Sequence, residues 1–213
     1  MTATGAPSWF TLRIPRSWFE FDVWRASRTG DLARLVDARI AQVPQLRPQR
    51  SALLKLLREV AARAERQGAV YCAATAELVD GSDGLVASVM VFHTDGAPNV
   101  ADNTAEAIAA QVTAMAQTGR RSPWRAVTIV EMAAGRAVRM RGIERSEPDG
   151  VPIDGVVMQT LIPVPGDRGV LNVVLSSPHV DIVEELFEVF NAISDTLVWS
   201  PDRPEQLHAT NSP

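Results

Sequence analysis

The feature that most constrains the fold of this chain is a change in the spacing of its apolar residues. In the segments 31–67 and 177–197 they recur every three or four residues, whereas between 124 and 176 they recur mostly every second residue. A spacing near 3.6 indicates an amphipathic helix, and a spacing of two indicates a half-buried strand. Each kind of element has one apolar face to bury, so we expect helices to cover a β-sheet.

Two consecutive helices are predicted over residues 31–67, which we call the αα segment. Asp31 is a suitable N-cap for the first helix, and Pro44 ends it. Pro48 suits the first turn of the second helix, which ends at Gly68 because glycine readily adopts the left-handed conformation of a helix C-terminus.

Two more helices are predicted, one at 103–118 and one following residue 176. In the first, Asn103 and Glu106 have the spacing of a capping box. Its apolar stripe consists of Ile108, Val112 and Met115. In the second, Ser177 is a good N-cap. The core stripe of this last helix consists of Ile182, Leu186, Val189, Phe190, Ile193 and Leu197.

Short turns join most of the predicted strands, which favours a mainly antiparallel sheet. The strands are expected at 9–14, 18–24, 70–79, 85–93, 125–132, 136–143, 154–163 and 169–176. The predicted fold class is therefore α+β, a mainly antiparallel β-sheet flanked by helices in an α/β/α sandwich. We expect one domain over residues 9–199, with disordered tails at 1–8 and 200–213.

Three segments in a particular order link the chain to a known group of folds. They are the opening Phe10-Thr-Leu-Arg-Ile-Pro-Arg-Ser-Trp18, the helix at 103–118 after a strand hairpin, and a closing strand and helix from Leu171 to Leu197. This order resembles the PsbP/Mog1-like α/β/α sandwich group, which includes the LpqN-type actinobacterial lipoproteins and in which the opening pattern forms the first hairpin.

The resemblance implies a largely non-enzymatic protein that binds other proteins or small ligands, and it transfers no catalytic residue. This chain departs from the group in its long αα segment and from the lipoprotein members in lacking a lipobox cysteine. The alanine- and arginine-rich composition indicates a GC-rich genome and suggests an actinobacterial source.

Charge and composition narrow the expected partners and the expected compartment. The net charge of -4 argues against a nucleic-acid-binding protein. Cys72 is the only cysteine, so no intrachain disulfide and no cysteine metal cluster can form. The N-terminus lacks the pattern of a secretory signal, and no apolar run approaches the roughly 20 residues that cross a bilayer. We therefore expect a cytoplasmic protein without membrane insertion, metal or cofactor.

The residues with catalytic potential each have a structural explanation. His93 and His179 stand alone, outside any metal-binding spacing. Ser177, His179 and Asp181 are close in sequence, but residues within one helical turn point in different directions, and an N-cap role accounts for the serine. Cys72 has no lysine or histidine beside it and is expected to be inert. These observations favour a protein that is not an enzyme.

A run of arginines in the middle of the chain has two interpretations. Apolar residues alternate with Arg139 and Arg141, which places these arginines on the solvent face of a predicted strand that also contains Arg136. The functional interpretation is a basic patch for an acidic partner. The structural interpretation, which we favour, is an ordinary solvated strand face.

Aromatic residues cluster near the N-terminus and also have two interpretations. Alternation puts Phe19 and Phe21 on one face of a strand and Trp18 and Trp24 on the other. One set must be covered by another part of the molecule, for which the αα segment is the candidate. Otherwise that set is an exposed patch and a partner site.

The sequence favours a non-enzymatic protein-interaction or accessory module whose partner is another protein. The candidate contact residues are Trp18, Trp24, Arg136, Arg139 and Arg141. One alternative is a carrier of a small or lipidic ligand in a pocket between sheet and helices. Another is an enzyme of an unrecognised type, which requires Asp, Glu, Arg and His side chains to converge. A homodimer is also left open.

Overall fold

A computed structural model describes residues 9–21, 29–77, 85–117, 124–146 and 153–201. The connection at 80–84 between the strands expected at 70–79 and 85–93 lies outside these residues, as does the candidate contact residue Trp24. The expected tail at 1–8 and most of the expected tail at 200–213 lie outside them as well.

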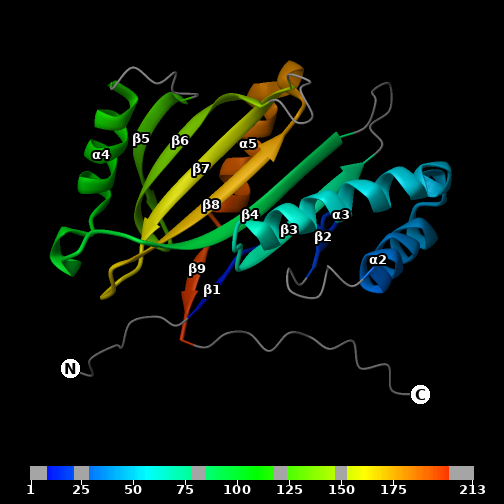
Figure 1. Cartoon of the computed structure of the whole chain (residues 1–213), viewed down its shortest axis with the longest axis horizontal. Coiled ribbons are helices and arrows are strands. Elements are labelled where there is room, and N and C mark those ends of the chain that lie inside the picture. The colour runs from blue at the N-terminus through cyan, green and yellow to red at the C-terminus, as the bar shows by residue number, and fades with distance from the viewer. Residues whose placement is uncertain (1–8, 22–28, 78–84, 118–123, 147–152, 202–213) are drawn as a thin grey trace.

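Seven strands form one antiparallel sheet, and two short strands form a separate ribbon (Figure 1). The order across the sheet is β2-β3-β4-β8-β7-β6-β5. Its strands, in chain order from β2 to β8, are Phe19–Glu20, Tyr71–Glu77, Leu85–Asp95, Trp124–Met132, Gly135–Ser146, Ile153–Pro163 and Gly169–Ser177. The ribbon pairs β1, Trp9–Thr11, with β9, Val198–Ser200.

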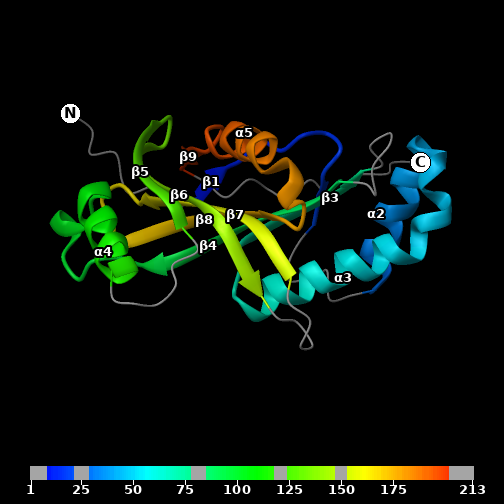
Figure 2. The ribbon, with the colours of Figure 1, turned by 90° about the horizontal axis from the view of Figure 1, so that it is seen from above.

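Helices cover both faces of the seven-stranded sheet, which gives three layers (Figure 2). One face is covered by α5 (Val183–Ser194), which follows the short 3-10 helix η4 (Val180–Ile182). The opposite face is covered at one end by α2, η1 and α3 and at the other end by α4, which follows the 3-10 helix η2. Their bounds are Thr29–Gln42 for α2, Pro44–Gln49 for η1, Arg50–Arg66 for α3, Val100–Asp102 for η2 and Ala105–Gln117 for α4.

The fold is therefore α+β, a mainly antiparallel sheet flanked by helices, as the apolar spacing predicts. The period-two segments became β3 to β8, and the period-3.6 segments became the four α-helices. The short turns between β5 and β6 and between β7 and β8 keep sequence neighbours paired in the sheet. The longer connections carry the helices onto its two faces.

The larger core lies between α5 and the sheet. The buried α5 side chains are Leu186, Phe187, Phe190 and Ile193. They pack on alternate residues of the central strands, which include Val89, Val91, Val156, Met158, Val173 and Leu175. Burying a side chain of this size contributes about 1.5–3 kcal/mol before the loss of conformational entropy is counted. This core is therefore the main attachment of α5.

The opposite face carries two smaller cores. The first joins α2 and α3 to β3 and β4 and includes Phe19 and Phe21. The αα segment thus covers this aromatic pair, whereas the alternation required only that one of the two aromatic sets be covered. The second core joins α4 to β6 through Ala105, Val138 and Met140.

The expected N-terminal hairpin does not form. The turn is present, because Trp18 N–H donates to Pro15 C=O at 3.0 Å, but the two strands beside it have different partners. Strand β1 pairs with β9 at the far end of the chain, whereas β2 pairs with β3. The prediction of a tail from residue 200 is wrong at its first residue, since Ser200 pairs with Trp9.

Several predicted helix ends differ from those observed. Asn103 does not cap α4: its amide donates to the carbonyls of Asp167 and Gly169, while Thr104 Oγ1 accepts from Ala107 N–H at 3.2 Å. Ser177 remains in β8, and α5 begins after η4. The first helix of the αα segment begins two residues before Asp31, and α3 begins after Pro48, which lies in η1.

Two residues assigned to apolar stripes are exposed. Met115 in α4 has 64% of its surface exposed, and Val189 in α5 has 41%. In α5 the buried position belongs to Phe187 instead, which lies on the same side of the helix as the buried Leu186, Phe190 and Ile193.

Candidate functional site

The structure divides the arginines of β6 between the two faces of the sheet. Arg136 lies on the α4 face, where it pairs with Glu106 of α4 and, at 2.9 Å, with Glu131 of β5. All three side chains are more than half exposed. Arg136 is therefore an exposed charge with two carboxylate partners, as the structural interpretation of the arginine run expects.

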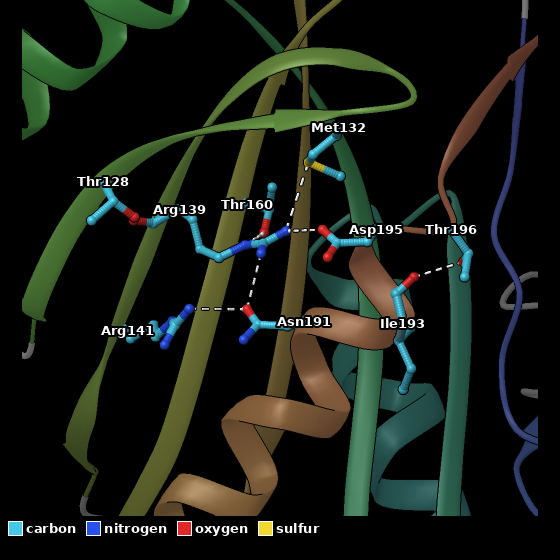
Figure 3. Close-up of polar contacts among 9 residues, drawn as sticks. All are labelled: Thr128, Met132, Arg139, Arg141, Thr160, Asn191, Ile193, Asp195 and Thr196. Atoms are coloured by element: carbon cyan, nitrogen blue, oxygen red, sulfur yellow. Dashed lines mark hydrogen bonds and ion pairs between the residues drawn. The ribbon is translucent and has the colours of Figure 1, made fainter.

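Arg139 lies on the other face and is buried, with 4% of its surface exposed (Figure 3). Its Nη2 donates to Asp195 Oδ1 at 2.6 Å, and its Nη1 donates to Asn191 Oδ1 at 2.9 Å. Its Nε lies 3.4 Å from Thr160 Oγ1 on β7. The prediction that Arg139 lies on a solvent face is wrong, because α5 covers the strand face that was expected to be open.

Arg141 lies two residues further along the same strand face and is half-buried. Its Nη2 donates to Asn191 Oδ1 at 3.2 Å (Figure 3). Its guanidinium carbon lies 5.6 Å from the centre of the Phe187 ring. Among the residues that the structure describes, no carboxylate lies within ion-pair distance of Arg141. This cation is held by an amide oxygen and a π-face only.

The two guanidinium groups share one acceptor on α5. Both Arg139 and Arg141 donate to Asn191 Oδ1, and within the described residues Asp195 supplies the only carboxylate of this group. Asn191 and Asp195 are four residues apart, so they project from the same side of α5 near its C-terminus, where the helix dipole favours cations. The cluster therefore contains one cation more than it has anions.

The Arg139 cluster lies beside the turn of the β5–β6 hairpin and the β1–β9 ribbon. Met132, the last residue of β5, places its sulfur 3.7 Å from Arg139 Nη2. The turn between β5 and β6, which follows Met132, is hydrogen-bonded to β9: Trp199 Nε1 donates to Ala134 C=O at 2.7 Å. These contacts fix the hairpin that carries both arginines relative to the C-terminal end of α5.

Trp18 is buried in the α5-side core, with 9% of its surface exposed, and does not form an exposed aromatic patch. The backbone just before Trp18 is also held, because the hydroxyl of Thr75 donates to the C=O of Ser17 at 3.5 Å. Of the candidate contact residues, Arg136, Arg139 and Arg141 share one strand, whereas Trp18 lies at the other end of the sheet. The structure does not bring them together in one surface.

The residues considered for a serine–histidine arrangement bind backbone instead. Ser177 Oγ donates to Val86 C=O at 2.7 Å, and His179 Nε2 accepts from Val86 N–H at 3.0 Å. Strand β8 is followed by Pro178, which has no N–H, so these side chains complete the hydrogen bonding of β4 where the ladder ends. Their hydrogen-bonding atoms are therefore engaged in the fold.

Burial shifts the pKa of three groups near β2 and β3. It raises the pKa of the Cys72 thiol to about 12, which keeps the thiol protonated and unreactive. Desolvation also raises the pKa of Glu20, although the neighbouring Tyr71 hydroxyl opposes this shift. The pKa of Tyr71 is raised by burial and by the charge of Glu20. This pair lies at the sheet end opposite Arg139.

The residues that the structure describes contain no group of three or more His, Cys, Asp or Glu side chains arranged to hold a metal ion. None of their helices combines the length and the hydrophobicity that a bilayer-spanning segment needs.

Comparison with known proteins found similar solved structures but no matching family model and no matching curated protein. The chain is similar to LpqN of Mycobacterium tuberculosis, described as involved in cell envelope biogenesis, with 11% identity and a TM-score of 0.46. The match covers 94% of this chain and 88% of that one.

Sequence reasoning missed the two α5 residues that organise the cluster. Asn191 and Asp195 are polar residues four apart in a helix, between the buried residues Phe190 and Leu197. That spacing places them on one side of the helix next to its buried stripe, where a buried cation is a natural partner. The spacing of Asn191 and Asp195 could therefore have indicated a polar contact beside the core. The strand that supplies the cation could not be identified without knowing where α5 packs on the sheet.

Proposed function

We propose that the protein is a non-enzymatic protein-interaction module that binds an acidic group of a partner protein at Arg141. The observation that carries the proposal is the excess cation of the Arg139–Arg141 cluster. Arg139 has Asp195 as its counter-ion, whereas Arg141 is half-buried and has no carboxylate partner among the described residues.

The surroundings of Arg141 suit recognition of a carboxylate. A guanidinium has five N–H donors, and only one hydrogen bond from Arg141 is made to the described residues. The bond to Asn191 and the contact with Phe187 restrict the side chain, so less conformational entropy is lost when an anion binds. A carboxylate can then accept two parallel N–H bonds from the same guanidinium.

Arg139 contributes to the proposed site through its charge and through the position of Asn191. It is too buried to meet a partner directly, and its counter-ion Asp195 is about half exposed. Because both arginines share Asn191 Oδ1, removal of Arg139 would free that amide to change orientation. We therefore assign Arg139 a positioning role and Arg141 the contact role.

The experiment begins by identifying the partner in the source cells. A photo-cross-linking amino acid at Ala126, an exposed residue paired with Arg141 in the β5–β6 register, would capture the molecule bound beside that arginine. Binding of the identified protein is then measured by calorimetry for Arg141→Gln. We expect at least a tenfold loss of affinity, and a steep decrease in affinity as salt is added.

Arg136→Gln is the matched control, since it removes an arginine from the same strand but from the opposite face. It should bind the partner as the unaltered protein does. Equal affinity for Arg141→Gln and the unaltered protein, or recovery of a stoichiometric metabolite with no protein partner, would overturn the proposal.

We also propose that the chain belongs with the PsbP/Mog1-like group, that it comes from an actinobacterium and that it works in the cytoplasm. The three-layer order of helices and sheet (Figure 2) supports the first, although the opening pattern does not form the hairpin that the resemblance implies, and the alanine- and arginine-rich composition supports the second. The single cysteine, Cys72, which is buried and forms no disulfide, fits the third, because disulfides are rare in reducing compartments. Fractionation of the source cells, with an antibody to detect the protein in each fraction, tests the cytoplasmic location.

A further inference from the structure

The two edges of the seven-stranded sheet differ in length and in protection. At one edge, β2 contains only Phe19 and Glu20. At the other, β5 contains nine residues and pairs only with β6 among the described strands. An edge strand leaves alternate backbone N–H and C=O groups without a partner, and natural proteins usually shorten or charge such edges. The β2 edge is short, and the β5 edge is long.

The middle of β5 also lacks the side chains that normally prevent pairing with another strand. Residues 126–130 read Ala-Val-Thr-Ile-Val, with no charge and no proline. Ile129 has 38% of its surface exposed, and Ala126 and Thr128 are exposed as well. The only irregularity of β5 is a bulge between Trp124 and Ala126, so the segment from Ala126 to Met132 pairs regularly with β6.

We propose that β5 pairs with β5 of a second copy of this chain, antiparallel about a two-fold axis at Thr128. Such an axis sets Val127 opposite Ile129 and Ala126 opposite Val130, so apolar residues meet apolar residues on both faces of the joined sheet. Thr128 meets its own copy, and threonine pairs of this kind stabilise neighbouring strands. A second copy is favoured over another partner because the segment is complementary to itself.

Charge does not oppose this register. Glu131, the only charged residue of the regularly paired segment from Ala126 to Met132, lies away from the axis and does not face its own copy. An isologous contact of this kind closes on itself as a dimer and leaves no free β5 edge for further growth.

The helix beside this edge supplies a second layer of contact. Apart from Glu106, α4 is uncharged along its whole length, and Ala107, Ala110 and Ala114 are exposed. Met115 of α4 and Ile129 of β5 are two of the large apolar side chains exposed among the described residues. Helix α4 packs on the face of β5 that holds Val127, so in the dimer the two α4 helices come near each other across the axis.

The dimer has a consequence for the arginine cluster, which rests on the proposed function. A two-fold axis perpendicular to a continuous sheet leaves both α5 helices on the same face. The two Arg141 side chains then flank a shared floor that contains Thr128 and Ala126 of both copies, so the dimer would present paired sites for an acidic partner.

Light scattering during size-exclusion chromatography measures the mass of the full-length chain directly. We expect a dimer for the unaltered protein, and a monomer for Ile129→Lys, which places two lysines close together near the axis. Val189→Lys is the matched control, because Val189 is exposed to a similar extent but lies on α5; it should remain a dimer. A monomeric unaltered protein at micromolar concentration overturns the proposal, as does a dimer that survives Ile129→Lys with native circular dichroism.

Cysteine cross-linking tests the register. Opposite residues of an antiparallel pair have Cα atoms about 4.5–5.5 Å apart, within the range of a disulfide. Cys72, the only native cysteine, is fully buried, so mild oxidation reports the introduced thiol. Thr128→Cys should form a covalent dimer and Val189→Cys should not, whereas equal cross-linking of the two variants contradicts the proposed axis.

The dimer and the anion site can fail separately. Arg141→Gln should remain a dimer, since Arg141 lies on β6 and not on the paired edge. If Arg141→Gln loses the partner and stays dimeric while Ile129→Lys is monomeric, both proposals are supported. If the protein is monomeric but Arg141→Gln still loses the partner, the dimer is wrong and the anion site remains.

Discussion

Arg136 and Arg139 stand three residues apart on β6, yet they are held in opposite ways. Arg136 lies on the α4 face, with its side chain half exposed between Glu106 and Glu131. Arg139 lies under α5, with one half-exposed carboxylate and two neutral oxygens around it. The alternation of side chains along a strand makes this division, and the helix on each face determines what the arginine meets.

The comparison teaches that the number of ion pairs does not measure the importance of an arginine. Arg136 has two carboxylate partners, but water screens all three groups, and exposed pairs contribute about 0–1 kcal/mol. Arg139 has only Asp195, but its charge is out of water, so each hydrogen bond it makes offsets part of a large desolvation cost. Loss of Arg139 contacts should therefore destabilise the fold far more.

The largest effect should come from Arg139→Ala. The substitution leaves a cavity beside Met132 and removes the donors that serve Thr160 and Asn191, of which Thr160 is fully buried. We expect the free energy of unfolding to decrease by about 3–5 kcal/mol. Urea denaturation followed by tryptophan fluorescence measures this change, and a loss below about 1 kcal/mol would contradict the comparison.

A smaller loss is expected for Asp195→Asn, which keeps the shape of the side chain and removes the counter-ion. The Arg139 cation then remains buried with only amide and hydroxyl oxygens around it. We expect a decrease of about 1–3 kcal/mol in the free energy of unfolding. The double variant Arg139→Met/Asp195→Asn should lose less free energy of unfolding than the sum of the losses of Arg139→Met and Asp195→Asn, because the two residues belong to one network. Strict additivity of the two losses would show that the ion pair is unimportant.

Glu20→Gln extends the comparison to a charge that has no cation beside it. Desolvation raises the pKa of Glu20 in the folded state, so the folded state favours the protonated carboxyl. The unaltered protein should lose stability as the pH rises through the unfolded and then the folded pKa of this group. Glu20→Gln should remove that decrease and be slightly more stable at neutral pH, as urea denaturation at several pH values measures; a variant less stable at neutral pH contradicts this.

The smallest effect is expected for Arg136→Ala. Both of its partners are exposed and remain solvated when the arginine is removed. The free energy of unfolding should change by less than about 1 kcal/mol, and added salt should reduce the difference further. Thermal denaturation at low and high salt measures it, and a loss comparable to that of Arg139→Ala would remove the distinction between the two faces.

The elements of the fold could be predicted from the sequence because their signals are local. Strands β3 to β8 and the four α-helices follow from the spacing of apolar residues within each segment. The pairing of β1 with β9 could not be predicted in this way, because its two strands are about 190 residues apart and only three residues long. Short strands carry too little periodicity to indicate a partner.

The candidate site was predictable only in part. The sequence identified Arg136, Arg139 and Arg141 as unusual, but it could not tell which strand face α5 would cover. Both faces of β6 carry residues that suit burial, with Val138 and Met140 on one and Ala137 on the other. The alternation was read correctly, and only the assignment of the solvent face was wrong.

By itself, the amino-acid sequence determined the elements of this protein, the antiparallel order of its central strands and the need to cover one of the two aromatic sets near the N-terminus. Those features depend on residues close together in the chain, or on the single apolar face that each element must bury. Only the tertiary structure decided that α5 lies over Arg139, that Asn191 serves two arginines and that β5 is the last strand of the sheet among the described residues. Each of these depends on which of two sheet faces a helix covers or on where the sheet ends, and residues distant in the chain decide both.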